Sequence, residues 1–137
     1  MSKFYRNKKY IAENIAQFKN WNEAEIGILR EIWKELQRTG GEEVELKLDE
    51  LKEKFASDKD NEEWEEILDA FSYKMIRLYY LNDFDERFKG ISPFRSVRND
   101  PQRNRLLVEA IGESFKLPNG IKGPFALYFL NEVMTNL

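Results

Sequence analysis

Polar and apolar side chains alternate in the six residues EVELKL (43–48), and this pattern limits the possible fold classes more than any other stretch of the sequence. A period of two is typical of a strand with one buried face, which Val44, Leu46 and Leu48 would form here. Apolar residues before and after this stretch recur at helical spacing instead. The chain is therefore predicted to belong to the α+β class, with helices packed on a small antiparallel sheet.

The helix that precedes this strand has sequence signals at both ends. Asn22 can cap its start, and Glu25 three residues later completes a variant of the capping box. Gly40 and Gly41 favour its end, because glycine accepts the left-handed conformation that a helix terminus requires. A less regular helix is expected before it, over residues 4–18.

Three more helices are predicted after the strand. Asp49 would cap a brief one, and a strongly periodic one begins near Asp60 or Asn61. The last helix has Pro124 at its first position, where a proline is tolerated. Apolar side chains occupy nearly all sides of this last helix, so either the core or a partner must cover it.

A β-hairpin is predicted between the last two helices. Its strands are expected at about residues 94–98 and 104–111, with a turn at Asp100-Pro101, since proline has no N–H to donate to a ladder. A further β arm is expected just before it, with a turn at Lys89-Gly90 and with alternating Leu78, Tyr80 and Phe84. Helix, helix, strand, helix, helix, hairpin, helix is the order of a winged helix. One winged-helix domain is therefore predicted over residues 1–137, with residues 1–10 as a mobile basic arm.

The composition removes several kinds of chemistry. The chain has no cysteine and no histidine, which excludes thiol and imidazole catalysis and the metal sites that those side chains form. We therefore expect a protein that is not an enzyme and has no cofactor. The N-terminus lacks the apolar core of a signal peptide, and no apolar run approaches the roughly 18 residues of a membrane span. A cytoplasmic protein is expected.

Charge is distributed unevenly along the chain. The net charge is −3, yet residues 42–69 hold thirteen acidic side chains against four basic ones, a net −9. Residues 1–20 hold five basic against one acidic, and residues 74–105 hold eight against four, so each has a net +4. Two basic ends with an acidic middle are therefore predicted, although three ordinary solvated faces would give the same totals.

The acidic middle begins like a calcium loop, with Asp58, Asp60 and Glu62 at alternating positions. The sixth position of such a loop needs glycine for a sharp turn, and Glu63 stands there instead. We interpret this stretch as the start of a capped acidic helix. That helix holds the place of a recognition helix, but its glutamates would be repelled by the phosphates that line a major groove.

Four arginines surround the predicted hairpin turn, namely Arg95, Arg98, Arg103 and Arg105. A guanidinium group is well matched to phosphate oxygens. The hairpin is therefore either a wing that contacts a nucleic-acid backbone or an ordinary solvated hairpin.

Most of the chain, from about residue 14 onward, resembles a known family in the order and spacing of five stretches. These are NWNEAEIGILREIWKEL, VELKLDELKEKF, WEEILDAFSYKMIRLYY, SPFRSVRNDPQRNRLLVEAIGESF and GPFALYFLNEVM. They resemble the N-terminal winged-helix domain of plasmid replication initiators that act at iteron-type (theta) origins. The resemblance implies two tandem winged helices, of which the first contacts the DNA backbone and mediates dimerisation while the second reads iteron bases. The chain ends at Leu137, where the second winged helix would begin.

The resemblance also suggests which residues contact double-stranded DNA. The basic leader, including Lys8 and Lys9, matches the N-terminal arm of the family, and Arg95, Arg98, Arg103 and Arg105 match its hairpin region. The leading hypothesis is thus a non-enzymatic, dimeric replication-initiator domain that contacts the DNA backbone with little sequence preference. A protein-interaction module without DNA binding and a small winged-helix transcription regulator are the alternatives.

Overall fold

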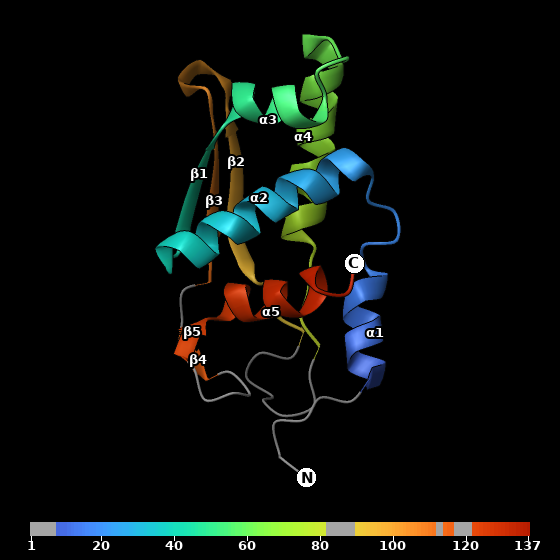
Figure 1. Ribbon diagram of the computed structural model, residues 1–137, viewed down its shortest axis with the longest axis vertical. Helices are drawn as coiled ribbons and strands as arrows, with labels where there is room; N and C mark the ends of the chain where they lie inside the picture. Colours follow the sequence, from blue (N-terminus) through green and yellow to red (C-terminus); the bar gives the residue numbers. More distant parts are fainter. Residues whose placement is uncertain (1–7, 82–89, 112–113, 117–121) are drawn as a thin grey trace.

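The computed structural model describes residues 8–81, 90–111, 114–116 and 122–137, shown in colour in Figure 1. These residues form five α-helices, a three-stranded antiparallel sheet and a separate two-stranded sheet. The elements in chain order are α1 (Lys8–Ala16), α2 (Glu23–Thr39), β1 (Glu43–Lys47), α3 (Leu48–Phe55), α4 (Asn61–Ile76), β2 (Phe94–Asp100), the 3₁₀ turn η2 (Pro101–Arg103), β3 (Arg105–Ala110), β4 (Ser114–Lys116), β5 (Lys122–Pro124) and α5 (Phe125–Met134).

The larger sheet has the strand order β1-β3-β2, with both pairings antiparallel. Val44 on β1 lies opposite Val108 on β3, and both side chains are buried together with Leu106. Residues in register share one face of a sheet, so the apolar alternation of β1 and β3 forms a single buried face. The predicted hairpin is confirmed, and the predicted strand is confirmed over Glu43–Lys47, whereas Leu48 belongs to the following helix α3.

Two capping boxes hold the starts of the longest helices. The Glu25 N–H donates to Asn22 Oδ1 at 2.9 Å, and the Glu63 N–H donates to Asp60 Oδ1 at 2.8 Å, while each glutamate accepts from its cap residue in return. Gly40 ends α2 with φ of 62°, in the left-handed region. These helix ends were predictable because the two residues of each capping box are only three positions apart and a glycine by itself favours a helix end.

Two predicted helix starts are wrong. Asp49 is the second residue of α3 and not its cap, because α3 already begins at Leu48, directly after β1. Pro124 is the last residue of β5 and not the first of α5, because pairing with Ser114 holds it in an extended strand. The β4–β5 pair itself was not predicted.

Two other predicted regions lie partly outside the described residues. Helix α1 begins at Lys8. Residues 4–7 of the expected helix and residues 1–7 of the expected basic arm therefore lie outside the described residues. In the predicted β arm, Tyr80 forms a single bridge with Ile91 and Gly90 has the positive φ of a turn, 75°. Phe84 and Lys89 lie outside the described residues.

Helix α5 lies inside the core of the chain, between α1, α2 and the β4–β5 pair (Figure 1). Phe125, Phe129 and Leu130 have no exposed surface. The Tyr80 ring packs edge-on against Phe125 and Phe129, with ring centroids 5.0 and 6.2 Å apart. The chain itself therefore covers the helix that the sequence showed to be apolar on nearly all sides.

Every helix in the described ranges is too short or too polar to cross a membrane.

Candidate nucleic-acid interface

The register of the sheet divides the four hairpin arginines among different surroundings. Arg98 on β2 lies opposite Leu107, and Arg105 on β3 lies opposite Asp100, so Arg98 and Arg105 share the outer face of the sheet. Arg103 lies in the turn η2. Arg95 lies at the other end of β2, five residues and about 17 Å of strand from Asp100.

Arg105 is held by carboxylates from both neighbouring strands. Its Nη1 lies 2.8 Å from Glu45 Oε1 on β1, and its Nε lies 3.2 Å from Asp100 Oδ2 on β2. These hydrogen bonds, first the one to Glu45 and then the one to Asp100, raise the pKa of Arg105 above its usual value. A guanidinium group with two carboxylate partners has little charge left for a phosphate, so Arg105 mainly ties the three strands together.

Arg95 has acidic neighbours. The register shifts between Phe94 and Ser96, so Arg95 forms a bulge without a partner residue on β3. It lines an open hollow together with three carboxylates, those of Glu42, Glu43 and Glu109. The local potential at Arg95 is therefore not positive enough to single it out as a phosphate contact.

Arg98 and Arg103 are the two hairpin arginines that stay largely available. Arg98 is exposed and has no ion-pair partner within the described ranges. Arg103 is 72% exposed, and its Nη1 lies 3.8 Å from Asp100 Oδ2, at the limit of an ion pair. Lys47, which the sequence did not single out, is exposed and lies opposite Arg105 at the same end of the sheet. Only the strand register reveals this neighbour.

Lys8 and Lys9 form the first turn of α1. In Figure 1, α1 lies at the opposite end of the molecule from the turn between β2 and β3. The two predicted sets of DNA contacts, the arm and the hairpin turn, are therefore not brought together in one patch.

The hairpin turn is anchored to the start of α3 by Asn104. The Leu48 N–H donates to the Asn104 carbonyl at 3.2 Å, and the Asp49 N–H donates to Asn104 Oδ1 at 3.0 Å. Asn104 has φ of 52°, in the left-handed region that asparagine tolerates better than most residues. It thus supplies from 55 residues away the cap that Lys47, the residue before α3, does not provide.

The start of helix α4 lies at the same end of the molecule as the hairpin turn (Figure 1). The first half of this helix carries several exposed acidic side chains. Four of its exposed carboxylates have no ion-pair partner among the residues described, namely those of Glu62, Glu65, Glu66 and Asp69. The first turns of a helix favour negative charge, which accounts for part of this distribution. An uncompensated row of carboxylates nevertheless repels phosphates.

The described residues contain no group of three or more carboxylates placed to hold a metal ion.

Comparisons of the chain with protein-family models, with curated proteins and with solved structures gave no match.

Proposed function

We propose that residues 22–110 form a winged helix and that the chain is a non-enzymatic domain of a plasmid-type DNA-replication initiator. The observation that carries this proposal is the order α2-β1-α3-α4-β2-β3 combined with the sheet order β1-β3-β2. In a winged helix, a strand precedes a pair of helices and then pairs with the following hairpin, which is the wing. The sequence resemblance to the first domain of such initiators supports the same assignment.

The proposed contact with double-stranded DNA is made to the backbone and has little sequence preference. Arg98 and Arg103 supply the available guanidinium groups on the wing, and phosphate contacts position a protein without reading bases. Helix α4 occupies the place of the recognition helix, but its carboxylates oppose entry into a major groove. Sequence reading would therefore belong to another domain of the initiator.

The proposed pairing of two copies uses the sheet. Helix α5 is buried within its own chain, which leaves an outer strand, β1 or β2, as the pairing surface. Sedimentation velocity tests this directly, because a dimer would have twice the mass of the 16.4 kDa chain. A single species at the monomer mass across micromolar concentrations would remove pairing from the proposal.

A salt titration of duplex binding tests the DNA contact. We expect a fluorescently labelled duplex to bind at 25 mM salt and to dissociate steeply as salt rises. The double variant Arg98→Glu/Arg103→Glu should weaken binding to all duplex sequences alike and reduce the salt slope by about two, one for each lost phosphate contact. Lys19→Glu/Arg30→Glu changes the same charge on other exposed residues and should have a smaller effect.

A protein-interaction module without DNA binding is the second candidate. It is favoured by the state of the hairpin, where Arg105 has two carboxylate partners and Arg95 lies beside three more. No duplex binding at low salt would select this candidate. Binding that the double variant weakens for one sequence only would point to a transcription regulator instead.

A further inference from the structure

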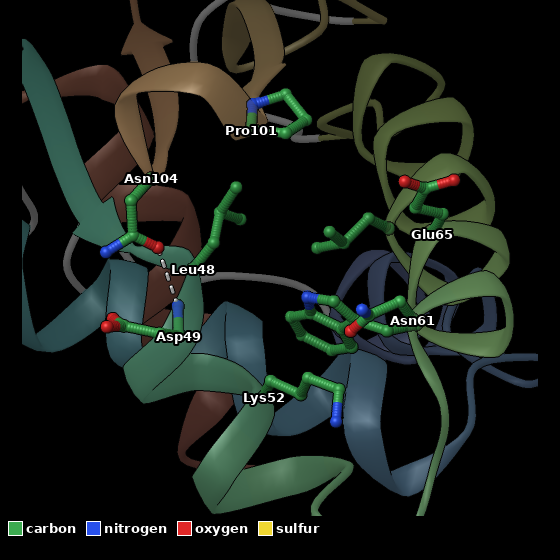
Figure 2. A pocket seen from close by; sticks show the side chains of 9 residues that line it. Leu48, Asp49, Lys52, Asn61, Glu65, Pro101 and Asn104 are labelled. Carbon is green, nitrogen blue, oxygen red and sulfur yellow. Dashed lines mark hydrogen bonds between the residues drawn. The ribbon is translucent and has the colours of Figure 1, made fainter.

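An apolar hollow lies between α3, the start of α4 and the hairpin turn (Figure 2). Its volume is about 320 Å³, at the small end of the range for ligand sites. The apolar side chains that line it are those of Leu48, Trp64, Leu68 and Pro101. Figure 2 shows Leu48 on α3 across the opening from Asn61 and Glu65 on α4, with Pro101 above, while the Asp49 carboxylate points away from α4. Such a hollow has room for one or two side chains of a partner.

The three walls of the hollow are fixed in place by hydrogen bonds. Asn104 ties the hairpin turn to the start of α3, and the Asp60 capping box holds the start of α4. Lys52 Nζ donates to the Lys59 carbonyl at 2.7 Å, which links α3 to the loop before α4. A partner would therefore meet a preformed site and would not have to order it.

The charge around the hollow is negative. Glu65 lines its opening, and Glu62, Glu66 and Asp69 extend the negative surface along α4. Lys52 is the only cationic residue among the described residues that line the hollow, and its ammonium group is engaged by the Lys59 carbonyl. This potential attracts a cationic partner and repels a phosphate backbone.

We propose that this hollow is the docking site for a basic peptide segment of another protein. One aliphatic or aromatic side chain of that segment would sit against Trp64 and Leu68, while a flanking lysine or arginine side chain would face Glu65. The proposed DNA contact uses Arg98 on the outer face of the sheet and Arg103 in the turn, so the two proposed sites share the hairpin turn but not their contact residues. Apolar anchors in a preformed pocket supply most of the affinity of such interfaces, and the charged rim supplies selectivity.

Fluorine NMR with 5-fluorotryptophan tests the proposal on the intact chain, because the protein has three tryptophans and one lines the hollow. The probe is a twelve-residue amphipathic peptide of lysine and leucine, and its control has serine in place of every leucine. We expect the first peptide to shift the Trp64 resonance, assigned with Trp64→Phe, and to bind at least about tenfold more tightly than the control. Equal binding of both peptides, or no shift at Trp64 with 1 mM peptide, would overturn the proposal.

Two neighbouring glutamates provide a matched pair of variants. Glu65 lines the hollow and Glu66 does not, although both are exposed on the first half of α4. Glu65→Arg should weaken the lysine–leucine peptide about fivefold, and Glu66→Arg less than twofold, because only the first charge faces the docked segment. Equal losses would show attraction to the acidic helix as a whole and no docking. Displacement of the peptide by a DNA duplex or by a second copy of the chain would assign the hollow to that occupant and overturn the proposal.

Discussion

The hairpin β2–β3 and the helix α4 meet at one end of the molecule, and they differ in how their charges are used. The hairpin carries four arginines, of which Arg105 is engaged by Glu45 and Asp100 while Arg95 lies among glutamates. The exposed carboxylates of α4 have no ion-pair partners among the residues described. Two of the four arginines of the hairpin thus lie beside carboxylates of its own sheet, whereas the exposed carboxylates of α4 lack such partners.

A run of charged residues in the sequence therefore does not by itself predict the electrostatic potential of the folded surface. Arg105 lies on the central strand, whose two neighbours supply the carboxylates of Glu45 and Asp100, and Arg95 lies beside three glutamates. The exposed glutamates of α4 have no ion-pair partner among the residues described. We therefore expect the hairpin to make few phosphate contacts and α4 to oppose DNA.

The largest expected effect comes from the residue that anchors the hairpin. Asn104→Ala should lower the free energy of unfolding by about 2 kcal/mol, because it removes the cap of α3 and places alanine in the left-handed region. Asn104→Gly keeps the left-handed backbone conformation and should lower the free energy of unfolding by about half as much. Urea unfolding at neutral pH measures both, and equal losses would show that the backbone conformation at this position contributes nothing.

The second-largest expected effect comes from neutralising the exposed carboxylates of α4, which should increase the affinity for DNA. In the variant Glu62→Gln/Glu65→Gln/Glu66→Gln/Asp69→Asn, duplex binding at low salt should tighten about tenfold, because four charges near the wing no longer repel phosphates. The control Glu23→Gln/Glu50→Gln/Glu53→Gln/Asp58→Asn removes the same charge from other exposed residues. An equal gain in both variants would show that net charge alone matters and that α4 does not face the duplex.

Removing the cap of α4 should have a smaller effect on stability. Asp60→Ala loses the acceptor for the Glu63 N–H and should lower the free energy of unfolding by about 1 kcal/mol. Asp60→Asn retains an acceptor and should be close to neutral. Thermal unfolding followed by circular dichroism distinguishes the two, and a large loss in the asparagine variant would contradict the capping explanation.

The smallest expected effect is a change in the pKa of Asp49, whose carboxylate lies beside Asn104. The pKa of Asp49 lies below its usual value, first because of a hydrogen bond with the Asn104 side chain and also because the Glu50 N–H donates to it at 2.8 Å. A lowered carboxyl pKa stabilises the fold above the usual value of about 3.9, and this contribution is lost as the pH falls through the folded-state pKa. Carbon-13 NMR of the carboxyl group should therefore show a higher pKa in Asn104→Ala. An unchanged pKa would show that Asn104 does not hold this carboxylate.

Several features could be predicted because neighbouring residues encode them. Asn22 with Glu25, Gly40 and the Asp100-Pro101 turn each determine a boundary through contacts within a few positions. The β4–β5 pair was missed, although Asn119-Gly120 between its strands is a hairpin signal in the sequence. Its strands have three residues each, too few for a period of two to stand out.

The order of the main helices and strands follows from the sequence alone, since hydrophobic periods and caps are local properties of the chain. The surroundings of the hairpin arginines depend on the tertiary structure, because the partners of Arg105 come from two different strands and Glu45 lies 60 residues away. The same holds for Asn104, whose role as a cap depends on a turn folding back onto a helix 55 residues earlier. Strand register and chain reversal bring such groups together, and neither can be read from residue types alone.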